Sequence, residues 1–217
     1  MNLFSLDSPL MRALNLIADL VILHLLWVLC SIPIFTMGAS TTALYYACMK
    51  RVRTKEGYIT RNFFHSFKEN FRQSTIVWLV LLVIGFLYVT NIRYGIFLDN
   101  TMGKVIIVGC SIFLIPYLLI AMYIFPVQAK FENPVIGNVK NALIMALRHF
   151  HYSLLLFFIW GSFFLMTRFS VPFMGLALIC GAGLMGWLTS MIFIQIFRKY
   201  IPDEIEEDLE KSGEKFI

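Results

Sequence analysis

The chain has 217 residues, of which 59% are hydrophobic and only 14% are charged, and its formal net charge is +5. A soluble domain needs about 25% charged residues to cover its surface. The composition therefore excludes an ordinary soluble protein and indicates an all-α, polytopic membrane helical bundle. Segments of about 10 residues with alternating hydrophobicity, which are typical of a transmembrane β-barrel, do not occur.

The N-terminal residues predict a helix rather than a processed leader. Met1 to Leu10 lacks a basic n-region, and no small-residue cleavage site follows the first apolar run, so we expect no removable signal peptide. Asp7 or Ser8 can cap a helix that has Pro9 in its first turn.

The stretch "SIPIFTMGASTTALYY" (31–46) decides how many spans the chain has. If Leu14–Met37 is one span, the N-terminus lies outside. If Pro33 ends one helix and Thr36 caps a returning one, Thr36–Met49, both termini lie inside. The returning span would be short, and protein rather than lipid would have to cover its ends. We favour about six (five to six) transmembrane segments with both termini cytoplasmic.

Four later apolar runs are long enough to cross a bilayer. They lie at about Thr75–Val89, Val105–Phe125, Ser153–Phe169 and Met174–Phe197. Lys and Arg are dense in the connections 50–72 and 130–148 and directly after 197, and they are sparse elsewhere. Basic connections stay cytoplasmic, which places the C-terminus inside a bacterial plasma membrane. The positive charges lie between spans, so they predict no nucleic-acid partner; the lipid bilayer is the expected partner.

Two of the basic connections share a pattern. "SFKENFRQSTIVWLVLL" (66–82) resembles "MALRHFHYSLLLFFIWG" (145–161). Both predict a cytoplasmic, amphipathic interfacial helix that turns into a span. A repeat of such units is one interpretation; the other is that any helix entering a membrane from the cytoplasm collects Arg, Lys and Phe.

The end of the chain changes character. We divide the chain into one integral membrane domain, 1–200, and an acidic cytoplasmic tail, 201–217. Pro202 can begin a helix, and the acidic residues that follow complement its dipole. The tail either packs on its own protein as a solvated helix or binds a partner.

Motifs that carry chemistry do not occur in the chain. No GxxxxGK[ST] loop, HExxH or Gly-x-Ser-x-Gly is present. Four single cysteines lie in separate apolar segments, and His149 and His151 point to different sides of a helix. We therefore expect no enzyme, no cofactor and no metal site.

Polar residues inside a span are the better functional signal, because an unpaired charge there is costly. Asp19 lies inside the first apolar run, and Asn15 shares its helix face. One interpretation is a carboxylate that contacts a ligand or carries protons. The other, which we favour, is an acid near the cytoplasmic end that pairs with Arg12 or with a neighbouring helix.

Small residues predict close helix packing. Ala39, Ala43 and Ala47 recur every four residues, as do Ala177 with Gly181 and Ala182 with Gly186. The candidate hinge and packing residues are Pro33, Gly38, Ala39, Thr42 and Ala43. A hydroxyl-lined solute site on the same face is the minority interpretation.

The stretches "SLDSPLMRALNLIADLVILHLLWVLCSIPIFTMGASTTALYYACMK", "EGY" and "SFKENFRQS" resemble the YesL family of bacterial membrane proteins, which is built on a domain of unknown function. The resemblance is strongest over about residues 4–90. Its most specific parts are Leu6-Asp7-Ser8-Pro9 and the block from Pro33 through Gly38-Ala39 to Thr41-Thr42-Ala43. It implies an association with carbohydrate uptake systems of the ABC type and carries over no catalytic residues.

Two functions follow as expectations. The first is an accessory or regulatory component of carbohydrate uptake, which binds a sugar ABC permease or a second copy of itself. The alternative is a small secondary transporter or channel that uses Asp19 and the broken-helix region Pro33–Gly38.

Overall fold

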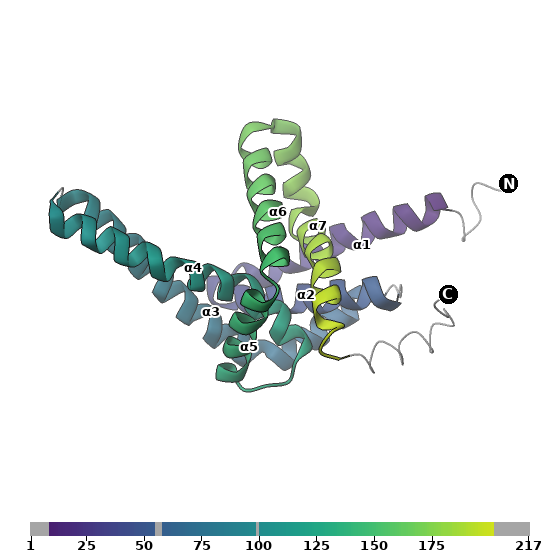
Figure 1. The fold of residues 1–217 in the computed structure, drawn as a ribbon. Helices are drawn as coiled ribbons and strands as arrows, with labels where there is room; N and C mark the ends of the chain where they lie inside the picture. The colour runs from purple at the N-terminus through teal and green to yellow at the C-terminus, as the bar shows by residue number, and fades with distance from the viewer. Residues whose placement is uncertain (1–8, 55–57, 99, 202–217) are drawn as a thin grey trace.

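The computed structural model describes residues 9–54, 58–98 and 100–201, and in that part of the chain the fold is all helical (Figure 1). Residues of the predicted N-terminal cap, the "EGY" motif and the acidic tail from Pro202 lie outside the described residues. The helices are α1 (Pro9–Ser31), the 3-10 helix η1 (Ile34–Thr36), α2 (Met37–Thr54), α3 (Ile59–Leu98), α4 (Thr101–Lys130), α5 (Val135–Arg148), α6 (Phe150–Phe169) and α7 (Val171–Phe197).

Five of these helices are long and apolar enough to cross a membrane: α1, α3, α4, α6 and α7. The count meets the lower end of the expected five to six. The segment expected as a sixth span is α2, which is a separate helix of 18 residues. It is not one of the five, because it carries hydroxyls and ends in basic residues, and it is enclosed by the other helices instead of lipid.

Helix α2 is the centre of the packing. It contacts α1, α3, α4 and α7, and its small side chains Ala39, Ala43 and Ala47 are fully buried. A Cβ atom at Gly38 would overlap the Ser74 carbonyl and Trp78 of α3. Small residues therefore let the neighbouring helices reach the α2 backbone, which is the packing expected of a small-xxx-small face.

The chain reverses between α1 and α2 at Pro33. Helix α1 ends at Ser31, and η1 carries the chain into α2. The Thr36 hydroxyl donates to the Cys30 carbonyl at 2.6 Å and to the Pro33 carbonyl at 2.7 Å. Thr36 directly precedes α2, and its side chain donates to one carbonyl in the last turn of α1 and to one within the reversal. The Trp78 indole N–H donates to the Ile34 carbonyl and ties the reversal to α3.

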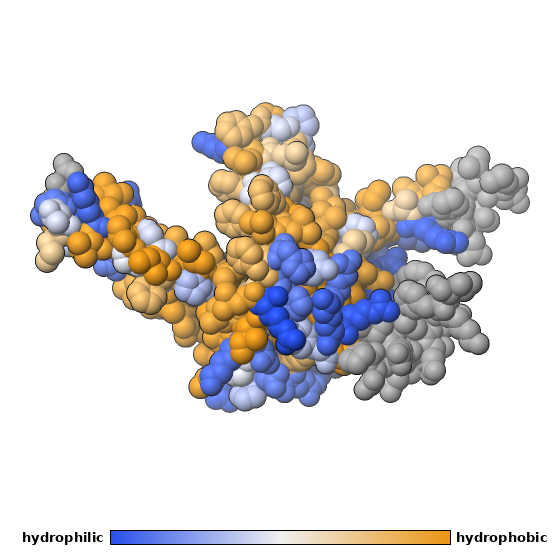
Figure 2. Space-filling view, in the orientation of Figure 1, coloured by the Kyte–Doolittle hydropathy of each residue, from blue (hydrophilic) through white to orange (hydrophobic). Residues whose placement is uncertain are grey.

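Two hairpins project from this centre in different directions (Figure 1). Helices α3 and α4 form one, and α6 and α7 form the other. Figure 2 shows that the projecting parts are mainly hydrophobic, whereas hydrophilic residues gather where the helices meet. Large apolar side chains on both hairpins are exposed, including Phe97, Phe113, Phe164 and Phe169. Such surfaces suit lipid or the transmembrane helices of another protein.

The two predicted interfacial segments differ in structure. The first does not turn before its span: residues 59–98 form one helix of 40 residues. Phe63 faces the protein core and is fully buried, whereas Phe64 and Phe71 are exposed. The second segment is α5, which is separated from α6 by a break at His149. The two segments therefore do not share the same structure: the first continues straight into its span, packed on α2, whereas the second is a separate helix.

A histidine of α1 contacts the backbone of α7. The Nε2 atom of His24 lies 2.8 Å from the Leu178 carbonyl oxygen, and the Ala182 N–H donates to Nδ1 at 3.1 Å. In an undisturbed helix the Ala182 N–H would donate to the Leu178 carbonyl. These partners assign a neutral imidazole with its proton on Nε2. The ring contacts both of these backbone groups and joins α1 to α7.

Candidate functional site

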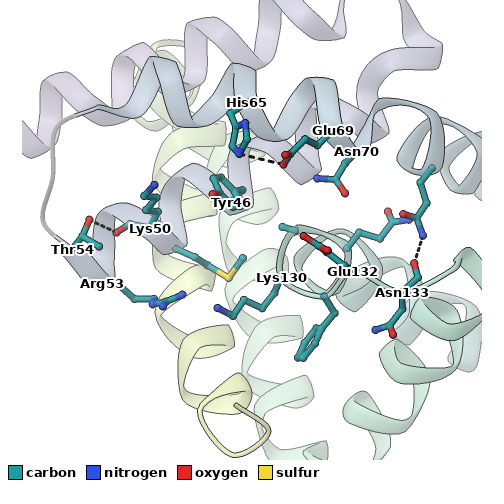
Figure 3. A pocket seen from close by; sticks show the side chains of 15 residues that line it. Tyr46, Lys50, Arg53, Thr54, His65, Glu69, Asn70, Lys130, Glu132 and Asn133 are labelled. Atoms are coloured by element: carbon teal, nitrogen blue, oxygen red, sulfur yellow. Dashed lines mark hydrogen bonds and ion pairs between the residues drawn. The ribbon is translucent and has the colours of Figure 1, made fainter. Parts of the chain in front are cut away.

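A polar cavity of about 730 Å³ opens where α2 ends, α3 begins and α4 joins α5 (Figure 3). It lies on the side that the basic connections predict to be cytoplasmic. Its lining residues are Tyr46, Met49, Lys50, Arg53, Thr54, His65, Glu69, Asn70, Gln73, Gln128, Ala129, Lys130, Phe131, Glu132 and Asn133.

Three stretches of sequence supply this lining. The last turns of α2 carry Lys50 and Arg53, where cations complement the helix dipole. The first turns of α3 place His65 and Glu69 on the opposite wall, with their ring nitrogen and carboxylate oxygen 3.4 Å apart. The connection after α4 closes the third side, since Lys130 ends that helix and the chain leaves it extended at Phe131.

A buried hydrogen-bond chain leads from Gln128, which lines the cavity, into the helical bundle. The hydroxyl oxygens of Thr42 and Ser74 lie 2.9 Å apart, and Ser74 donates to the Gln128 Oε1 atom at 3.2 Å. Gln128 is only 3% exposed, and its Nε2 atom has no hydrogen-bond partner. A buried donor without a partner costs free energy. The Gln128 amide is therefore available to an acceptor atom in the cavity.

The rim is held by backbone and side-chain contacts. Gln73 of α3 donates from Nε2 to the Asn133 carbonyl at 2.6 Å, which joins two walls that are 60 positions apart in sequence. Arg53 and Lys130 reach toward one another across one end of the cavity (Figure 3). Two cations in that arrangement favour an anionic group between or beside them.

This arrangement can bind a ligand through ion pairs and hydrogen bonds. The cations and the Gln128 amide donate, and the carboxylates of Glu69 and Glu132 accept. Within the described residues, no group of three or more His, Cys, Asp or Glu side chains could hold a metal ion. The charged and polar lining is suited to the recognition of a polar molecule.

The structure places Asp19 and Asn15 outside this cavity. Asp19 accepts a hydrogen bond from Arg51 Nε at 2.6 Å, and both side chains are largely buried. Asn15, one turn earlier, is exposed. Of the two partners that the sequence suggested for Asp19, this ion pair uses the neighbouring helix. Its position shows that α2 runs back along α1 from the reversal at Pro33.

The candidate hinge residues lie on the packing face of α2. Gly38, Ala39, Thr42 and Ala43 are buried against the neighbouring helices, and Pro33 lies at the reversal. Only Thr42 approaches the cavity, through its contact with Ser74. The face therefore serves packing along most of its length and the polar network at one point.

His149 lies apart from the cavity, at the break between α5 and α6. Its Nε2 atom is 3.2 Å from the Tyr200 hydroxyl oxygen, and its ring lies 6.2 Å from that of His151. Burial lowers the pKa of His149, and the positive charges of Lys199, His151 and Arg148 lower it further. His149 therefore favours its neutral form and supports the helix junction.

Sequence reasoning missed the residues at the inner end of the cavity. Ser74 and Gln128 lie near the ends of apolar runs, where a single polar residue is usual. One feature of the sequence could have drawn attention to Gln128: it follows Pro126 and comes directly before the basic connection that begins at Lys130. The contact of His24 with Leu178 was not predicted either, because the two residues are 154 positions apart in sequence.

Comparison with known proteins finds one family model that matches part of the chain, and it carries no activity. A family model described as a protein of unknown function, DUF624, matches residues 20–92. No curated protein and no solved structure matches the chain. The matched residues overlap the part that resembles the YesL family, and they include α2 and most of α3. They also supply two walls of the cavity.

Proposed function

We propose that this multi-pass membrane protein is a non-enzymatic accessory or regulatory component of carbohydrate uptake of the ABC type. Its place would be the bacterial plasma membrane, with the C-terminus in the cytoplasm. The link to carbohydrate uptake rests on the resemblance of residues 4–90 to the YesL family. The DUF624 model, which matches residues 20–92, describes a family of unknown function and adds no activity to this proposal.

The observation that carries an accessory role is the exposed apolar surface of the two diverging hairpins. Phe113 of α4 is 66% exposed and Phe164 of α6 is 71% exposed. Both lie on helices that suit a membrane span, and neither lines the polar cavity. Helices of a permease can pack against such surfaces while the cavity stays open to the cytoplasm.

Photo-crosslinking tests this proposal in the native membrane. A benzophenone side chain at Phe113 or Phe164 should link the protein to a permease subunit of an uptake system and should be recovered in mild detergent. The matched control is Tyr58, which is 69% exposed but lies at the basic start of α3. Adducts with lipid alone, or equal adducts from all three positions, would count against a specific partner. Adducts between two copies would indicate self-association instead.

A second test uses growth. A strain that lacks the protein should grow more slowly on particular oligosaccharides and normally on glucose, because an uptake component affects only its own solutes. Restoration by the full chain is the control. Unchanged growth across an oligosaccharide panel would argue against the carbohydrate link.

A small secondary transporter or channel is the second candidate. The observation that favours it is the buried chain of Thr42, Ser74 and Gln128, which extends the polar cavity into the helical bundle. Purified protein in liposomes should then move a solute. Asp19→Asn should abolish that movement while leaving the protein folded. A loss of movement that merely follows a loss of folded protein would not support this candidate.

A further inference from the structure

A basic cluster lies where α5, α6 and α7 meet, and it consists of Arg148, His151 and Lys199. Arg148 ends α5, His151 is in the first turn of α6, and Lys199 directly follows the last turn of α7. All three residues are exposed. Burial lowers the pKa of His149, and the positive charges of the three residues lower it further. The three charges therefore gather around one point, although separate helices supply them.

Within the part of the chain that the structure describes, no carboxylate forms an ion pair with the basic cluster. Those residues include three acids, and each lies elsewhere. Asp19 pairs with Arg51, Glu69 lies beside His65, and Glu132 lines the polar cavity. The aromatic contact of the cluster, between the guanidinium of its arginine and a tyrosine ring at 5.9 Å, leaves the positive charge in place. The surface therefore favours an anionic partner.

The basic cluster lies at the level where two membrane spans end. Helix α6 begins here and α7 ends here, and both are long and apolar enough to cross a membrane. The Tyr152 ring lies 4.2 Å from that of His151, and the Tyr200 hydroxyl oxygen lies 3.2 Å from His149 Nε2. Tyrosines at the end of a span are typical of the depth of the lipid headgroups. The cluster is therefore placed to meet a headgroup.

An exposed apolar face continues from the basic cluster along α6. The positions i, i+3, i+4 and i+7 of one helix face are occupied by His151, Leu154, Leu155 and Phe158. The three apolar side chains are 48%, 46% and 66% exposed. At 1.5 Å per residue, Phe158 lies about 10 Å along the helix from His151. Figure 2 shows the same division, with hydrophilic residues at the base of the α6–α7 hairpin and mainly hydrophobic residues along it.

We propose that the basic cluster binds the phosphate of an anionic phospholipid, whose acyl chain lies along the apolar face of α6. A zwitterionic lipid also carries a phosphate, but the cluster would repel its ammonium group, so a lipid with a net negative charge is preferred. A soluble phosphate would use the cluster and leave the apolar face without a partner. This inference does not depend on the proposed uptake role.

Native mass spectrometry of the full chain in mild detergent measures this binding. The probes are phosphatidylglycerol and phosphatidylcholine with the same acyl chains. Each cation near a headgroup changes the affinity for an anionic lipid about fivefold, so Arg148→Gln with Lys199→Gln should weaken the apparent Kd for phosphatidylglycerol about 25-fold and leave that for phosphatidylcholine unchanged. The matched control is Arg93→Gln with Arg168→Gln, which removes the same charge at the opposite ends of α3 and α6 and should retain the preference.

Lys199→Gln alone keeps the test valid if the double variant does not fold, because Lys199 is exposed beyond the end of α7; its loss of affinity should be about fivefold. The swap Arg148→Lys with Lys199→Arg conserves charge and should bind as the native chain does.

Three results would overturn the proposal. An equal loss in the Arg93 and Arg168 control would show a response to net charge alone. Unchanged phosphatidylglycerol affinity without the two cations would place the lipid elsewhere. Displacement of the lipid by millimolar glycerol phosphate would identify a soluble anion as the ligand.

Discussion

Replacing Asp19 by Asn, Arg51 by Gln, and both together forms a double-mutant cycle on the ion pair that joins α1 to α2. The Nε and Oδ2 atoms are 2.6 Å apart, and the two side chains are 16% and 14% exposed. Asn keeps the shape of Asp19 but removes its charge. The cycle therefore measures the charged interaction itself and not a loss of packing.

The expected magnitude follows from the burial of the pair. Exposed ion pairs contribute about 0–1 kcal/mol, whereas hydrogen bonds to charged groups contribute about 1.5–3 kcal/mol. Since both side chains are largely buried, we expect Asp19→Asn to lower the free energy of unfolding by about 2 kcal/mol. The coupling energy of the cycle should be about 1–2 kcal/mol, because residual solvent access screens part of the interaction.

Unfolding by sodium dodecyl sulfate in mixed micelles, followed by tryptophan fluorescence, measures these energies. Arg168→Gln serves as the control, because Arg168 is exposed at the end of α6; its effect should stay within about 0.5 kcal/mol. A coupling energy below about 0.5 kcal/mol, as for independent sites, would refute the reasoning. Abolished solute movement in liposomes at unchanged stability would instead assign Asp19 a role in transport.

The remaining predictions concern helix contacts and pH. A Cβ atom at Gly183 would overlap the backbone of α1, so Gly183→Ala should cost about 1–3 kcal/mol, whereas Gly109→Ala, with open space around it, should be nearly neutral in the same unfolding assay. His24→Leu should cost about 1–3 kcal/mol, because two backbone groups of α7 lose their partner, and hydrogen exchange at the α7 amides should accelerate. The pKa of His149 is lowered in the folded protein, so His149 contributes stability above the unfolded pKa of about 6.5. This stability is lost as the pH falls through the folded pKa. A pH series of unfolding should show the loss in the native chain but not in His149→Asn.

Several features of the fold follow from the sequence because they depend on local composition. Each apolar run of about 20 residues must be helical, since lipid leaves backbone groups no other partner. The structure accordingly has helices at all four later spans, although each begins and ends a few residues beyond the apolar run or, in α3, many residues before it. Pro33 predicted the break after the first span for a similar reason, because proline lacks an N–H.

The polar cavity could not be predicted in the same way. Its residues come from α2, α3 and the end of α4 with the connection to α5. Each of them is a residue type that is common at its position in the local sequence. Ser74 and Gln128 lie 54 positions apart. Nothing in either local pattern shows that one hydroxyl will meet one amide inside the bundle. The partner of Asp19 could not be predicted either, because it depends on how α2 packs against α1.

By itself, the sequence determined that the chain is a helical membrane protein and where its later apolar helices lie, and it offered Pro33 as one of two possible ends for the first of them. These properties depend on hydrophobicity over short windows, which lipid converts directly into helices. Only the tertiary structure decided that α2 is enclosed by protein, that Asp19 meets Arg51, that His24 contacts α7 and that a polar cavity opens at their base. These contacts join residues 32 to 158 positions apart, and they depend on how small side chains let the helices approach one another.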